Sequence, residues 1–439
     1  MSEAPLPQST ASSRARFDSE AAAQAAAVRA RRHERMRAGL ARRHLDDRLF
    51  RWAGFAAVGF SALILVLLLA SMSLNGLAGF ERYEIRLDLP VKGELLVDPS
   101  RLAQPQPLDA LEVGGLPALI DAAAERQLGD GGSALIADTG WRDAGAELVA
   151  HPDLLAARSI PLTVPASDEL ANAARGSGAP ELQARARKLM ASGVLVHSFD
   201  WGFLARSDAT SPQMVGIWGA LKGSIMTMLV TLALAFPVGV LAALYLEEYA
   251  PRNRWTDLIE ISINNLAAVP SIIFGLLGLA VFLVIFPNDR SAPLVGGMTL
   301  ALMTMPVIVI SGRNAIKAVP PSLRDAALAV GASPLQVVFH HVLPMALPGI
   351  LTGTIIGMAR ALGETAPLLM IGMRAFVASP PATLTSPATV LPVQIFLWSD
   401  EIDRGFIERT SAAIIVLLVF LLVMNGLAIY LRNRFEKRW

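Results

Sequence analysis

Apolar residues gather along the chain in six long runs that polar, charged segments separate. A helix needs ~20 mostly apolar residues to cross the ~30 Å of hydrocarbon in a bilayer. The runs are about that long, although the fourth is short and contains Pro306. The pattern therefore predicts six membrane-spanning helices, near residues 53–74, 216–243, 257–286, 295–312, 347–373 and 410–431.

A long and more polar segment, residues 78–212, separates the first run from the second and is called the insertion below. Apolar and charged side chains alternate over 83–89, which is typical of a half-buried strand. Residues 115–127 and 181–191 have helical composition, and 159–164 fits a strand or a loop. We expect one small α+β domain, without a metal cluster or a catalytic nucleophile.

Composition sets the class of protein. Hydrophobic residues make up 53% of the chain and charged residues 17%, and the mean hydropathy is +0.48. These values exclude an ordinary soluble domain. Cysteine is absent, so no disulfide and no thiolate metal site can form. An all-α polytopic membrane protein with a small α+β insertion is the expected fold class.

Charge gives the orientation. Arg and Lys collect in residues 1–49, in loops near 252–254 and 313–324, and in the tail 432–438. Because positive loops stay on the cytoplasmic side, we expect both termini in the cytoplasm of a bacterium and the insertion in its periplasm. We expect residues 1–49 to be largely disordered, with room for a helix near 18–44. Their Arg-rich run lacks interleaved aromatic residues, so it suits lipid headgroups and not nucleic acid.

The first run could be mistaken for a cleaved signal peptide. It is longer than the usual apolar core of such a peptide, and no clear cleavage site follows it. We interpret residues 50–77 as a retained transmembrane anchor.

The cytoplasmic loop 313–345, called the coupling loop below, has residues spaced for two short helices joined by a turn. A carboxylate in a first turn suits the helix dipole, Gly331 ends or bends a helix, and Pro344 opens the next one. A compact loop of this kind is suited to docking a partner protein. An ordinary helical hairpin without a docking role is the alternative interpretation. The residues concerned are Asp325, Ala326, Ala327, Gly331, Leu343 and Pro344.

The third run is interrupted by Pro270 and Ser271, within the segment 268–275. Proline inside a span frees backbone carbonyls, which must find partners in protein or water and not in lipid. The break therefore borders a cavity, or else it is a kink that neighbouring helices relieve.

The fifth run carries a charged pair, Arg360 and Glu364, followed by Thr365. Their i, i+4 spacing places both on one helix face. If the span begins near residue 350, Arg360 lies roughly halfway across. Charges at such depth normally face the bundle interior or a water-filled path, and the Arg fork suits an oxyanion. A static ion pair that locks the helix is the alternative.

The segments 269–275 and 359–367 and the coupling loop together resemble the PstA type of phosphate permease, a membrane subunit of ABC importers. The resemblance covers residues 215–435 closely and 50–77 loosely. Asp325 stands where the family usually has Glu, and His341 where an aliphatic residue is common. The insertion is also much larger than the short first loop of a minimal member.

The resemblance implies the type I ABC importer permease fold, with a core over residues 213–435. It also implies a second homologous permease subunit, two copies of an ABC ATPase, a periplasmic phosphate-binding protein, and inorganic phosphate as solute. The ATPase would dock on the coupling loop, and Arg360, Glu364, Thr365, Pro270 and Ser271 would lie along the solute pathway.

The chain has no Gly-x-x-x-x-Gly-Lys-Ser/Thr segment, so it cannot cradle nucleotide phosphates by itself. We expect no catalytic residue and no cofactor in this chain, with ATP and Mg²⁺ used by the partner. Two other functions stay open. One is a permease for sulfate or molybdate, and the other is a membrane sensor or scaffold in which the insertion binds a ligand.

Overall fold

The computed structural model describes residues 46–72, 74, 76–77, 79–91, 94–95, 97, 102, 107–374 and 376–435. The chain divides into two compact units, Met1–Ser71 and Met72–Trp439. The expectations for residues 1–45 lie outside the described residues. In the first unit a helix begins at Asp46 and continues to Met72, with a mean hydropathy of 2.5.

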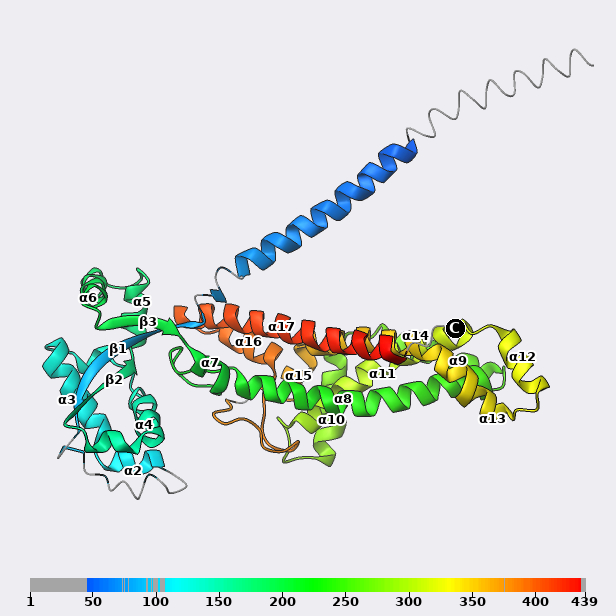
Figure 1. Cartoon of the computed structure of the whole chain (residues 1–439). Coiled ribbons are helices and arrows are strands. Elements are labelled where there is room, and N and C mark those ends of the chain that lie inside the picture. Colours follow the sequence, from blue (N-terminus) through cyan, green and yellow to red (C-terminus); the bar gives the residue numbers. More distant parts are fainter. Residues whose placement is uncertain are drawn as a thin grey trace, which may run out of the picture. The chain divides into compact units, whose positions relative to one another are not determined.

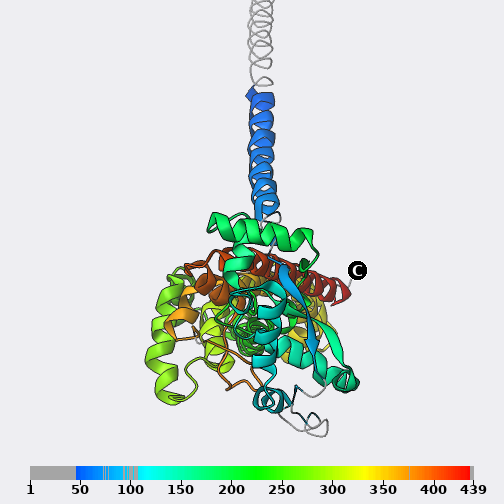
Figure 2. The same ribbon diagram turned by 90° about the vertical axis from the view of Figure 1, so that its left-hand side faces the viewer.

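The insertion is built on a three-stranded antiparallel sheet with the order β2-β1-β3 (Figures 1 and 2). In the central strand Ile85, Leu87 and Leu89 are buried, so the predicted alternation is confirmed. Leu87 lies opposite Leu162, and Tyr83 lies opposite His197. The strands are β1 (Glu81–Pro90), β2 (Ser159–Pro165) and β3 (Leu195–Phe199).

Helices pack on this sheet and close the insertion's hydrophobic core. The two predicted helices are confirmed as α3 and α6, and the segment near 159–164 is a strand. The helices are α2 (Pro107–Val113), α3 (Leu116–Leu128), α4 (Trp141–Ala150), α5 (Asp168–Ala174), α6 (Pro180–Ala191) and α7 (Trp201–Ala205). Short 3₁₀ turns, η2 and η3, lie at Ser133–Leu135 and Pro152–Ala156.

The rest of the second unit is helical. Among the described residues of both units, five helices are long and apolar enough to cross a membrane, or six if a bent pair counts as one span. The bundle comprises α8 (Trp218–Leu244), α9 (Arg254–Ala267), α10 (Ser271–Ile285), α11 (Pro293–Lys317), α12 (Pro321–Ala329), α13 (Pro334–Gln336), α14 (Leu343–Gly363), α15 (Ala366–Met370), α16 (Leu391–Ser399) and α17 (Arg404–Phe435). Two π turns, η4 (Tyr245–Tyr249) and η5 (Val337–Val342), extend α8 and join α13 to α14.

The predicted limits need correction in two places. The fourth span is not short: α11 continues through Pro306 and reaches Lys317. The fifth is not one helix over 347–373, because α14 ends at Gly363 and a separate short helix, α15, follows.

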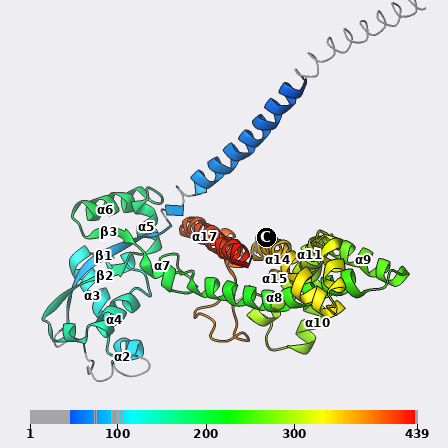
Figure 3. The ribbon, with the colours of Figure 1, turned by 45° about the vertical axis from the view of Figure 1, so that its right-hand side comes forward.

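Glycines bring the spans together. A Cβ on Gly297 would lie 2.5 Å from Val230 of α8, and one on Gly353 of α14 would lie 1.8 Å from the Ser311 hydroxyl of α11. Small residues at such positions let helix backbones approach closely, as is common between membrane helices. Within the second unit, the sheet of the insertion lies at one end of the bundle (Figures 1 and 3), and α12 and α13 lie at the other end (Figure 1).

Candidate coupling surface and solute pathway

The coupling loop folds as two helical segments joined at a glycine, but their limits differ from the prediction. Pro321 opens α12, so Asp325 lies in the second turn and not in the first. Gly331 follows the end of α12 with φ +91°, in the left-handed region that glycine tolerates best. Pro334 opens the second segment behind a capping box between Ser333 and Gln336.

Pro344 lies in the first turn of α14, as predicted, but α14 continues a longer helical stretch. The stretch runs from Pro334 to Gly363, 30 residues, through the π turn Val337–Val342. The wide turn directly before Leu343 and Pro344 gives a proline ring room that a regular helix would deny it.

The outer face of the coupling loop is exposed and partly apolar. Asp325 and Ala326 are exposed, whereas Ala327 is buried against the bundle. Large apolar side chains that a soluble domain would hide face outward around them: Leu328, Val330, Leu335 and Phe339. Exposed apolar side chains of this kind are typical of surfaces that meet a protein partner, and they make this loop the candidate coupling surface.

Ion pairs hold the base of the coupling loop. Arg313 contacts Glu260 at 2.9 Å and Glu247 at 3.3 Å. Arg324 pairs with Glu248 at 2.8 Å and donates to the carbonyls of Val319 and Ile316. These contacts join the loop to the ends of α8 and α11, so a force on the loop reaches both helices.

The predicted break in the third span is real and large. The helices α9 and α10 meet at Pro270 with a bend of 105°, and Ser271 is the first residue of α10. Four residues further on, a Cβ on Gly275 would lie 2.6 Å from the Cα of Pro367. This close approach places the start of α10 against α15.

Arg360 and Glu364 do meet, although the helix between them ends. Arg360 lies in the last turn of α14, and Glu364 is the capping residue beyond it, with extended backbone. The Nε of Arg360 lies 3.4 Å from the Oε1 of Glu364. Because the continuous helix begins at Pro334, Arg360 lies near its far end and not midway along it.

The side chain of Arg360 is 48% exposed and that of Glu364 19%. Glu364 and Thr365 directly precede α15, and α15 packs against α10, the helix that Ser271 opens. The predicted coupling residues Asp325 to Gly331 belong to α12 and the turn after it, and α12 lies at the end of the bundle away from the insertion (Figure 1).

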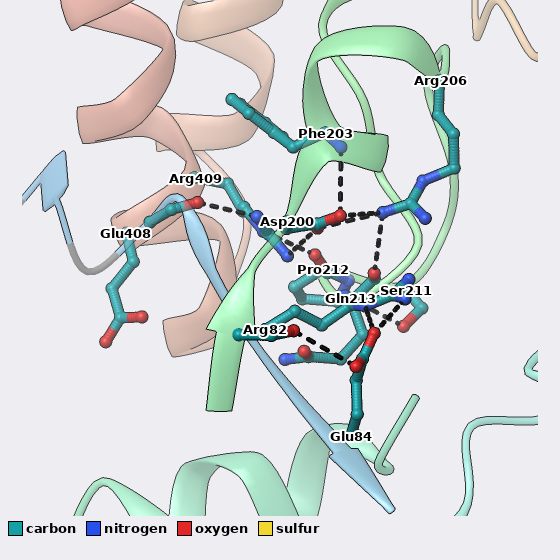
Figure 4. Close-up of polar contacts among 12 residues, drawn as sticks. Arg82, Glu84, Asp200, Phe203, Arg206, Ser211, Pro212, Gln213, Glu408 and Arg409 are labelled. Carbon is teal, nitrogen blue, oxygen red and sulfur yellow. Dashed lines mark hydrogen bonds and ion pairs between the residues drawn. The ribbon is translucent and has the colours of Figure 1, made fainter. Parts of the chain in front are cut away.

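A buried arginine that the sequence did not reveal joins the insertion to the bundle (Figure 4). Arg409 of α17 donates to the Oδ2 of Asp200 at 2.8 Å, to the carbonyl of Pro212 at 2.8 Å and to the carbonyl of Gly79 at 2.7 Å. Its side chain is 2% exposed and that of Asp200 1%. The chain enters the insertion at Gly79 and leaves it at Pro212, so Arg409 bonds both of the segments that connect the insertion to the bundle.

The network continues into the insertion. Arg206 pairs with Asp200 at 2.8 Å and with Asp143 at 3.3 Å, and Arg82 contacts Asp143 and Glu84. In the sequence Arg409 directly precedes an apolar run, so its charge is what one expects of a residue in a solvent-exposed loop. Its carboxylate partner is 209 positions away, which no local pattern could indicate.

The comparisons with known proteins agree with this architecture. Residues 235–437 match the family described as "Binding-protein-dependent transport system inner membrane component". A probable ABC transporter permease of Bacillus subtilis, YqgI, is 30% identical over 55% of this chain and 86% of its own length. The phosphate transport system permease protein PstA of Haemophilus influenzae is 31% identical over 53% of this chain and 82% of its own. The chain belongs to the PstA type of ABC importer permease.

PstA of Yersinia pestis is also similar to this permease, with 32% identity over 48% of this chain and 71% of its own. Residues 37–184 match a family described only as a domain of unknown function. Among solved structures, the inward-facing MetNI methionine ABC transporter covers 50% of this chain at 18% identity and a TM-score of 0.41. That score is low, so the family assignment rests on the sequence relatives.

Proposed function

We propose that this permease carries inorganic phosphate into the cell across the bacterial inner membrane, with both termini in the cytoplasm. The names of its relatives PstA support phosphate. The observation that carries the proposal is Arg360, which is half exposed in the last turn of α14 and paired with Glu364 just beyond the end of that helix.

The geometry suits an oxyanion. A guanidinium offers paired donors that match the oxygens of a phosphate. The contact with Glu364 is long at 3.4 Å, so the carboxylate orients the guanidinium while leaving donors available. In one conformation a phosphate would take these donors. In the other Glu364 would hold them, which supplies the differential contact that a two-state pathway requires.

The continuous helix Pro334–Gly363 explains how coupling could work. One end of this 30-residue stretch belongs to the coupling loop, and Arg360 lies near the other end, about 40 Å from Pro334 at ~1.5 Å per residue. Two copies of an ABC ATPase would dock on the coupling loops of this chain and of a second permease subunit, and a periplasmic phosphate-binding protein would deliver the solute. ATP and Mg²⁺ act in the ATPase, and this chain needs no cofactor and catalyses no reaction.

Uptake of labelled phosphate tests the proposal. Cells that lack this gene would receive wild type, Arg360→Ala, Arg360→Lys or Glu364→Gln, with micromolar external phosphate and sulfate as competitor. We expect uptake with wild type that sulfate does not inhibit, and loss with Arg360→Ala at equal membrane abundance. Arg360→Lys keeps the positive charge but loses the paired donors of the guanidinium, so it should raise the apparent KM for phosphate.

Full competition by sulfate or molybdate would assign another oxyanion. Full uptake with both Arg360→Ala and Glu364→Gln would remove the pair from the pathway. A stoichiometric signalling partner with no uptake would favour a sensor or scaffold.

A further inference from the structure

A groove of about 940 Å³ opens where the insertion meets the bundle. One wall is formed by α5, α6 and the turn between them, and the other by the loop from α16 to α17. The lining residues are Glu169, Asn172, Gly176, Ser177, Gly178, Ala179, Leu182, Gln183, Ile402 and Asp403.

Contacts between the two walls fix the shape of this groove. Arg175, at the end of α5, pairs with Glu408 of α17 at 3.0 Å. The amide of Asn172 donates to Asp403 at 3.5 Å, and Arg409 anchors the adjoining junction to Asp200. Because the walls are joined, a partner would meet a preformed surface and would lose little entropy in ordering it.

The surface chemistry is specific. Ile402 is 99% exposed, more than an isoleucine in a loop would be if it packed on its own chain. It stands in the run Asp400-Glu401-Ile402-Asp403, and the charged residues that line the groove, Glu169 and Asp403, are acidic. An apolar side chain inside an acidic rim fits a partner with an apolar pocket surrounded by Lys and Arg.

We infer that this groove docks the solute-binding protein on which the importer depends. The matching family is described as binding-protein-dependent, and in the proposed orientation such a partner meets the permease on the side opposite the coupling loop. The helices that form one wall of the groove, α5 and α6, lie at the end of the bundle away from α12 and α13 (Figure 1). The inference rests on the proposed function, which supplies this orientation and the phosphate-binding protein used in the test; ATP hydrolysis that this protein does not stimulate even in wild type would count against the proposed solute and not against the groove.

The absence of cysteine permits a direct test. Ile402→Cys would carry a photoactivatable cross-linker in the assembled importer, reconstituted in liposomes with a periplasmic phosphate-binding protein loaded with inorganic phosphate. Val113→Cys is the matched control, because Val113 is an 86% exposed apolar residue of α2 in the same insertion. We expect a cross-linked product from position 402 and none from 113.

A second measurement is needed because a long cross-linker could capture a binding protein that is docked elsewhere on the permease. Stimulation of ATP hydrolysis by the loaded binding protein would be titrated for Ile402→Lys and Val113→Lys. A lysine at 402 removes the apolar anchor and reverses the local charge, so the half-maximal concentration should rise roughly 10-fold or more, whereas Val113→Lys should match wild type. Equal cross-linking at both positions, or an unchanged titration for Ile402→Lys, would overturn the inference. Normal docking without phosphate uptake would instead count against the proposed solute.

Discussion

Arg409 and Arg360 show two opposite uses of a guanidinium. Arg409 is buried and each of its nitrogens has an acceptor, one on the carboxylate of Asp200 and two on backbone carbonyls. Arg360 is half exposed and has a single long contact with Glu364. A buried charge is tolerated only when it is fully paired, so Arg409 is committed to structure. Arg360 keeps exposed guanidinium donors, as its proposed role in binding phosphate requires.

Truncating Arg409 should destabilise the permease strongly. Arg409→Ala leaves Asp200 with Arg206 alone and leaves the carbonyls of Gly79 and Pro212 without their donor, and removing one partner of a buried ion pair costs about 3–5 kcal/mol. We expect a much lower melting temperature in detergent and reduced membrane abundance. The control is Arg126→Ala, whose ion pair with Glu94 is 3.7 Å long and about half exposed, and which should change little. Similar melting of the two variants would contradict this account.

Asp325→Glu should be tolerated. Asp325 is exposed on the second turn of α12, so one added methylene meets no packed neighbour, and the carboxylate keeps its charge. The ATPase should still co-migrate with the permease on a native gel, and uptake should stay at the wild-type rate. Loss of the complex at normal permease abundance would show that the carboxylate position is itself recognised.

At the scale of helices, the apolar runs predicted the spans because length and hydropathy alone decide whether a segment can cross a bilayer. The 105° bend at Pro270 could be predicted only as a break, since its angle depends on how α10 packs on α15. Asp325 was misplaced because Pro321 opens α12 earlier than expected. The Arg360–Glu364 contact was predictable from its spacing, whereas the Arg409 cluster depends on residues far apart in the sequence.

Gly353→Leu should separate α11 from α14. A Cβ at Gly353 would lie 1.8 Å from the Ser311 hydroxyl and 2.2 Å from the Ser311 Cβ, so the helices must move apart. We expect a loss of folded protein, measured as monodisperse material by size-exclusion chromatography. Gly426→Leu is the control: it is a helical glycine of α17 with nothing within 4 Å of its Cβ position. Equal yields would mean that the helices adjust without cost.

At the scale of the whole molecule, the insertion is joined to the bundle by direct polar contacts and not only by the connecting chain. Deleting residues 78–212 and joining the ends with Gly and Ser removes Gly79, Asp200 and Pro212 together, which are the three partners of Arg409. The guanidinium would then be left without its acceptors beside α17.

We therefore expect the deletion to lower membrane abundance, and Arg409→Met in the same chain to restore part of it by removing the stranded charge. Immunoblots of purified membranes measure both. A deletion that accumulates to the wild-type level without the second change would show that the insertion is dispensable for folding.

The Arg409 contacts also set an order in time. Gly79 is synthesised 330 residues before Arg409, an interval of roughly 15–70 s at the usual 5–20 residues per second. In the later part of that interval Asp200 can already pair with Arg206, but Arg409 does not yet exist. The junction can close only when the last helix is made, so a nascent chain that stalls before α17 leaves the carbonyls of Gly79 and Pro212 without the donor that they have in the finished permease. Quality-control proteases would meet an open junction in the stalled chain and a closed one in the finished permease.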